Sequence, residues 1–74
     1  MRISDLKKGQ CGTIKGFFAG DLPEKFYEMG LLPGIRVELY NDSWSKDPLY
    51  LKMEGCALAI RKAEADKIEV ELEK

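Results

Sequence analysis

Large apolar side chains recur at every second position in four short segments of the second half of the chain, and this period of two constrains the fold most. In a β-strand, successive side chains point to opposite faces, so such a segment buries one face and exposes the other. The pattern predicts four short strands of an antiparallel sheet. The recurring positions are Ile35, Val37 and Leu39; Leu49, Leu51 and Met53; Cys56, Leu58 and Ile60; and Ile68, Val70 and Leu72.

The first half of the chain predicts one more strand and a helix. Residues Cys11–Phe18 are rich in β-branched and aromatic side chains, which favour extended structure. Residues Asp21–Gly30 predict a short helix: Asp21 and Glu24 form a capping-box pattern at its start, and Gly30 supplies a left-handed stop at its end. The helix therefore follows the first strand directly.

The 74 residues provide one compact core and no room for a second lobe. Five short strands in so few residues bury their inner faces best when the sheet curls into a partly closed barrel. A single helical turn at Ala63–Asp66 would precede the last strand. We therefore predict one domain over residues 1–74, mainly β: a small SH3-like barrel of about five antiparallel strands, with a short helix after the first strand and a helical turn before the last.

The charge balance argues against nucleic-acid and membrane partners. The chain carries 12 basic and 13 acidic side chains, for a formal net charge of −1, and the basic residues are scattered. Proteins that bind nucleic acid usually carry a basic stripe that neutralises phosphates. The chain has no apolar run of bilayer length, and the N-terminus lacks the pattern of a secretory signal. We expect a cytoplasmic protein.

Catalysis has little support in the sequence. There is no histidine, so the usual general base for a serine or cysteine nucleophile is missing. No paired-carboxylate pattern and no glycine-rich phosphate-binding loop occurs. We predict no catalytic residues and no cofactor, and a protein that is not an enzyme.

The two cysteines do not predict a metal site. Cys11 and Cys56 are far apart in the sequence, whereas zinc sites normally use four Cys or His ligands, or three and a water molecule. Cys56 is in phase with Leu58 and Ile60, so we expect a core thiol. Cys11 begins a strand and could be buried or half-exposed.

The remaining candidates are surface residues for protein contact. Trp and Tyr are favoured at interfaces because one ring desolvates a large area at a small entropy cost. Two alternatives remain open: Met29 and Leu31 could belong to the core with only Leu32 exposed, and Trp44 could cap one end of the barrel. The predicted partner-binding residues are Met29, Leu31, Leu32, Tyr40, Trp44 and Tyr50.

The most specific motif of the chain is the block Glu28–Gly34, which is followed by Ile35–Glu38 and later by Ala57–Ala65. These segments resemble the FeoA family of small cytoplasmic proteins associated with ferrous iron transport. The similarity also includes Asp47-Pro48 and Gly55, and it extends to the opening Ser4-Asp5-Leu6 with Gly9 and Gly12. Ser45-Lys46 depart from the family, in which a glycine often precedes the Asp-Pro pair.

The resemblance implies an SH3-like barrel that serves as an accessory partner of the membrane transporter FeoB, which has a cytoplasmic GTP-binding domain. The chain would then act as an adaptor that modulates the conformation or GTPase cycle of FeoB. An alternative is a metal-handling module that presents a transition-metal ion to the transporter. The oligomeric state, including a monomer, stays open.

Overall fold

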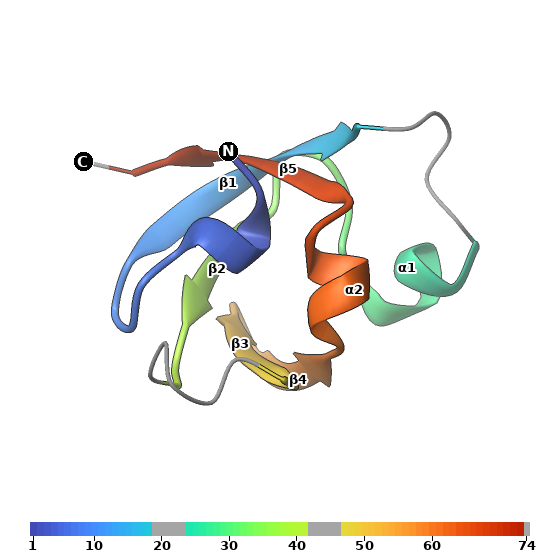
Figure 1. Ribbon diagram of the computed structural model, residues 1–74. Coiled ribbons are helices and arrows are strands. Elements are labelled where there is room, and N and C mark those ends of the chain that lie inside the picture. The colour runs from blue at the N-terminus through green and yellow to red at the C-terminus, as the bar shows by residue number, and fades with distance from the viewer. Residues whose placement is uncertain (19–23, 42–46, 74) are drawn as a thin grey trace.

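The computed structural model describes residues 1–18, 24–41 and 47–73, which form five strands and three short helical segments (Figure 1). The strands are β1 (Cys11–Phe17), β2 (Arg36–Leu39), β3 (Leu49–Met53), β4 (Cys56–Ile60) and β5 (Ile68–Leu72). The helical segments are a 3-10 turn, η1 (Ile3–Asp5), and the helices α1 (Glu24–Met29) and α2 (Lys62–Ala65). In the described ranges, no helix has the length and apolarity that crossing a bilayer requires.

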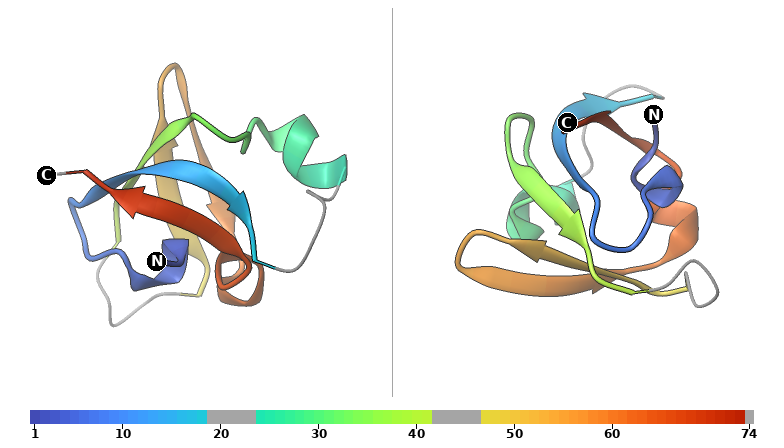
Figure 2. Two further views of the ribbon diagram at one scale, coloured as in Figure 1. Left: turned by 90° about the horizontal axis from the view of Figure 1, so that it is seen from above. Right: turned by 90° about the vertical axis from the view of Figure 1, so that its left-hand side faces the viewer.

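The five strands form one antiparallel sheet in the order β4-β3-β2-β1-β5. The sheet curls around the core, and η1 and α2 lie near each other on its open side (Figure 2). This is the mainly β, SH3-like barrel that the sequence predicts. The first strand ends one residue earlier than expected, at Phe17, and the described part of the first helix begins at Glu24, because residues 19–23 lie outside the described ranges.

The period of two sorts the strands into a buried and an exposed face. In β3, Leu49, Leu51 and Met53 are buried, whereas Tyr50 and Lys52 between them are exposed. The core also receives side chains from η1 and both helices, and Leu6, which follows η1, is fully buried. The buried hydrophobic residues are Ile3, Leu6, Ile14, Phe26, Leu31, Val37, Leu39, Leu49, Leu51, Met53, Ile60, Ala65, Ile68 and Val70.

Two predicted core positions are wrong, and both lie at strand ends. Leu72, the last residue of β5, is 38% exposed, because the barrel wall ends before the strand does. Cys56, the first residue of β4, is exposed rather than a core thiol. It pairs with Met53 beside the Glu54-Gly55 turn, so it keeps the phase of Leu58 and Ile60 but projects beyond the closed part of the barrel.

Two glycines let β1 bend between its neighbours. A side-chain carbon at Gly12 would lie 3.1 Å from the backbone oxygen of Glu71, so the close approach of β1 and β5 favours glycine there. The pairing of these strands shifts register between Ile14 and Gly16, which is a β-bulge that bends the strand. Gly12 and Gly16 thus provide the close contact and the bend with which β1 pairs with β5.

Helix α1 ends in a Schellman motif. Gly30 has φ of 82° and its N–H donates to the Tyr27 oxygen at 3.1 Å, while the Leu31 N–H donates to the Phe26 oxygen at 2.9 Å. These two bonds satisfy carbonyls that the helix would otherwise leave unpaired, and the left-handed residue makes them possible. The helix stop predicted at Gly30 is confirmed.

Replacing Gly30 with valine should destabilise the domain by about 1–3 kcal/mol, because a β-branched residue is strained at this positive φ. The free energy of unfolding from urea titration measures the loss. Gly30→Asn is the control, since asparagine tolerates the left-handed region, and it should lose clearly less. Equal midpoints for Gly30→Val and the parent would show that the backbone strain is absent.

Candidate protein-interaction surface

Two exposed tyrosines gather on the outer side of the barrel wall. Tyr40 follows β2, Tyr50 lies in β3, and the two are 45% and 49% exposed. The Tyr40 N–H donates to the Tyr50 oxygen at 2.8 Å, which holds the two backbones side by side. The pairing of β3 with β4 places Ala59 opposite Tyr50 and Ala57 opposite Lys52.

We call the surface of Tyr40, Tyr50, Ala57 and Ala59 the aromatic face. With Asn41 and Leu58, these residues line an open depression of about 510 Å³. The small alanines leave the tyrosine rings uncovered on the β4 side, so the face is largely apolar although it lies on the outside of the sheet. Surfaces of this kind mark sites of interaction when they are contiguous.

Asn41 fixes the geometry of the aromatic face. Its Nδ2 donates to the Pro48 oxygen at 3.0 Å, and its Oδ1 accepts from the Tyr50 N–H at 3.2 Å. These bonds tie the chain at the end of β2 to the chain at the start of β3. The tyrosines are therefore held on an ordered backbone, which lowers the entropy cost of binding.

Lys52 gives the aromatic face a charged border. Its Nζ lies 5.7 Å from the centroid of the Tyr40 ring, in the range of a cation–π interaction. Lys52 is exposed and also pairs across the sheet with Glu38 of β2. The apolar surface therefore ends at a positive charge followed by a negative one.

A groove lies beside this charged border, at the open end of the barrel. It encloses about 620 Å³ and includes Met29, Ile35, Met53 and Cys56 among its apolar walls. Its charged walls are Arg36, Glu38, Lys52 and Glu54. Lys52 thus borders both the groove and the aromatic face, and Met29 is the one predicted contact residue that the groove contains.

The six predicted contact residues do not form one cluster. Tyr40 and Tyr50 meet on the aromatic face, whereas Met29 lines the groove and Leu32 is half-buried. Leu31 is 0% exposed and belongs to the core, so the structure corrects its assignment as a contact residue. The Schellman motif explains this placement, since the residue after the left-handed glycine turns back toward the helix. Trp44 lies outside the described residues.

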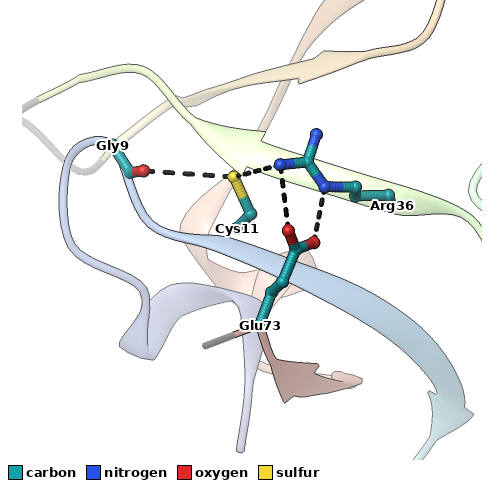
Figure 3. A network of polar contacts seen from close by, with 4 residues as sticks. All are labelled: Gly9, Cys11, Arg36 and Glu73. Atoms are coloured by element: carbon teal, nitrogen blue, oxygen red, sulfur yellow. Dashed lines mark hydrogen bonds and ion pairs between the residues drawn. The ribbon is translucent and has the colours of Figure 1, made fainter.

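Cys11 is half-exposed and takes part in a polar network on the outer face of β1 (Figure 3). Arg36 binds Glu73 with both of its forked nitrogens, with Nε at 2.5 Å from Oε2 and Nη2 at 3.2 Å from Oε1. The same Nη2 lies 3.1 Å from the Cys11 sulfur. The hydrogen bond from Arg36 lowers the pKa of Glu73, and the same bond raises the pKa of Arg36.

Other exposed ion pairs also connect separate elements of the fold. Lys15 of β1 contacts Glu71 of β5 at 2.8 Å, and this contact lowers the pKa of the Glu71 carboxyl. Lys25 of α1 contacts Glu64 of α2, which lowers the pKa of Glu64. These pairs are structural. Within the residues that the structure describes, no three Cys, Asp or Glu side chains come together as metal ligands would.

Ala57 and Ala59 line the aromatic face, and the sequence pattern did not single them out. Both occupy the outward positions between the apolar residues of β4, where alanine gives no signal of its own. Their importance comes from the register, which places Ala59 opposite Tyr50. The sequence hints at an apolar outer surface only in that these outward strand positions carry alanine and not a charged residue.

The chain resembles known proteins in sequence and in fold. The model of the FeoA domain matches residues 1–72. No match to this chain was found among curated protein sequences. A crystal structure of an iron uptake regulatory protein (FeoA) superposes with a TM-score of 0.82 at 25% identity, covering 97% of this chain and 95% of that one.

Two further solved structures share the fold. The solution structure of iron(II) transport protein A from Clostridium thermocellum has a TM-score of 0.83 and 37% identity, and the match covers 97% of this chain and 45% of that one. FeoA from Stenotrophomonas maltophilia, solved in complex with zinc, has a TM-score of 0.78 at 21% identity, covering 96% and 89%. Because the family model matches residues 1–72 of the 74 in this chain, the chain belongs to the FeoA family, which is associated with ferrous iron transport.

Proposed function

We propose that this chain is a cytoplasmic, single-domain adaptor of ferrous iron uptake that binds the cytoplasmic part of a FeoB-like transporter through its aromatic face. It acts by binding and not by catalysis. The observation that carries the proposal is the pair of exposed tyrosines, Tyr40 and Tyr50, held by Asn41 beside the small side chains of β4. Membership of the FeoA family supplies the link to ferrous iron transport.

The composition of the aromatic face suits a protein partner. Tyrosine rings are large and stiff, so they bury much area for little lost entropy, and the alanines allow a partner side chain to approach the rings. Lys52 and Asn41 provide a polar border, as the rims of protein interfaces usually do. A partner that fits would present an apolar side chain to the depression and a carboxylate or carbonyl oxygen near Lys52.

Binding can modulate a transporter only if the adaptor prefers one of its conformations. A ligand shifts a conformational equilibrium by its difference in affinity for the two states, and about 1.4 kcal/mol of difference is a tenfold shift. The adaptor therefore has to bind the nucleotide states of the transporter with unequal affinity. We propose that the aromatic face makes this state-dependent contact.

A titration against the soluble cytoplasmic domain of the transporter, with and without guanine nucleotide, tests the proposal. Replacing Tyr50 with alanine should weaken binding about 10- to 30-fold, the usual effect of truncating an interface anchor. Tyr27→Ala is the matched control, because Tyr27 is a 58% exposed tyrosine on α1 that does not line the aromatic face, and it should bind like the parent.

Three results would count against this proposal. The parent protein could fail to bind in either nucleotide state, which would remove the adaptor function itself. Tyr50→Ala could bind like the parent, or Tyr27→Ala could lose as much affinity, which would place the contact elsewhere on the barrel. The melting temperatures of both variants show whether each is folded under the conditions of the titration.

A further inference from the structure

Strand β4 is one end of the sheet, and its outer edge offers free backbone groups. The Tyr40 N–H donates to the Tyr50 oxygen, so the backbone N–H and C=O groups of Tyr50 point toward β2. Those of Lys52, two residues further along β3, point the same way. In an antiparallel pair the hydrogen-bonding residues alternate, so β3 binds β4 through Leu49, Leu51 and Met53. The residues opposite Tyr50 and Lys52, which are Ala59 and Ala57, therefore direct their N–H and C=O groups away from the sheet.

Within the described residues, this edge carries none of the features that usually keep a strand from pairing with another chain. Natural edges carry charged side chains, proline or bulges, or are covered by another segment. The sequence of β4 is Cys-Ala-Leu-Ala-Ile, with no charge and no proline. At the other end of the sheet, the N-terminus covers β5: Arg2 forms a bridge with Glu69, and the Val70 N–H donates to the Met1 oxygen at 2.7 Å.

Opposite charges stand at the two ends of the β4 edge. Glu54 lies in the turn before the strand, is exposed, and has no ion-pair partner among the described residues. Arg61 and Lys62 follow the strand directly and are exposed at its other end. Among the described residues, the Lys62 side chain has one long ion pair, with Asp66 at 3.9 Å, which holds it weakly.

We propose that β4 pairs with β4 of a second copy of this chain, antiparallel and about a two-fold axis. If the axis passes beside Leu58, Ala57 lies opposite Ala59 of the second copy. The free N–H and C=O groups of each of these residues can then form hydrogen bonds with those of the other. The same register brings Glu54 near Lys62 of the second copy, twice by symmetry. A two-fold interface must be complementary to itself. This edge meets the condition, because it is apolar at its centre and carries opposite charges at its two ends.

The shape of the molecule leaves this edge accessible. The β3–β4 hairpin projects from the barrel with the Glu54-Gly55 turn at its tip (Figure 2), and β4 lies on the border of the fold (Figure 1). Two paired five-residue strands make a small interface, so we expect a dimer that forms and dissociates with concentration. This inference concerns the protein alone and does not depend on the proposed function.

Sedimentation velocity of the purified chain, from about 10 µM to about 1 mM, measures the association. The parent should shift from monomer toward dimer over this range. The variants Glu54→Lys and Lys62→Glu should each dissociate at least about threefold more readily, because each turns two symmetry-related attractions into repulsions. An equal mixture of the two variants should regain the parent's association, since the mixed dimer restores both attractions.

The control is Glu28→Lys, which makes the same charge change at an exposed position of α1, away from the edge. It should associate like the parent. A parent that stays monomeric throughout the range overturns the proposal. So does a mixture of Glu54→Lys and Lys62→Glu that associates no better than either variant alone, because the dimer would then use another surface.

Discussion

Replacing Phe26 with alanine should leave most of this protein unfolded at 25 °C. Phe26 is 1% exposed, and its ring centroid lies 5.0 Å from that of Phe17, so it attaches α1 to the end of β1. Removing a buried phenylalanine costs about 3–5 kcal/mol, from the lost transfer free energy and the cavity left behind. A single core of this size supplies about as much net stability, so the variant should have little folded population.

The neighbouring aromatic residue provides the control for this prediction. Tyr27 follows Phe26 in α1 but is 58% exposed, and Tyr27→Ala should change the free energy of unfolding by less than about 0.5 kcal/mol. Far-ultraviolet circular dichroism during urea titration compares the two variants. If Phe26→Ala unfolded at the same urea concentration as Tyr27→Ala, α1 would not be part of the core.

Replacing Leu31 with alanine should destabilise the protein by about 2–5 kcal/mol, the range for a buried leucine. Leu31 is 0% exposed, and its N–H is bound to the Phe26 oxygen at 2.9 Å. The sequence offered Leu31 either as a core residue or as a contact for a partner. Loss of stability is the expected signature of a core residue, and it should appear without any partner present.

Leu32→Ala is the comparison for Leu31→Ala, because Leu32 is only half-buried and should lose clearly less stability. Thermal melts of the isolated chain rank the two variants. A Leu31→Ala variant that melts like the parent but fails to bind the transporter domain would restore Leu31 as a contact residue. The burial of the Leu31 side chain in the core would then be wrong.

Hydrophobic alternation was sufficient to predict the strands but not where the barrel ends. The period of two identifies the buried faces of β2 and β3, and Gly30 identifies the end of the helix. The helix start predicted at Asp21 lies outside the described residues. The alternation of apolar and polar residues shows only on which side of the sheet a residue lies. Cys56 and Leu72 have the correct phase and are nevertheless exposed, because burial also depends on whether another layer covers that end of the strand.

The candidate site could be predicted only in part, because its composition depends on how the strands pair. Tyr40 and Tyr50 are large aromatic residues at outward positions, and this was enough to select them from the sequence. Their proximity depends on the pairing of β2 with β3, and the contribution of Ala57 and Ala59 depends on the pairing of β3 with β4. A shift of one residue in either register would move these side chains to the other face, and hairpin register is set by the turns between the strands.

Backbone amide signals can show residue by residue whether the aromatic face binds the transporter. The isotope-labelled chain is titrated with the unlabelled cytoplasmic domain of a FeoB-like transporter, and the shift of each amide signal is recorded. We expect the largest shifts at Tyr40, Asn41, Tyr50, Ala57 and Ala59, with little change at Tyr27 and Glu28 on α1. Shifts concentrated on α1 or on the Arg36–Glu73 network, with the aromatic face unchanged, would show that the transporter binds another surface of the barrel.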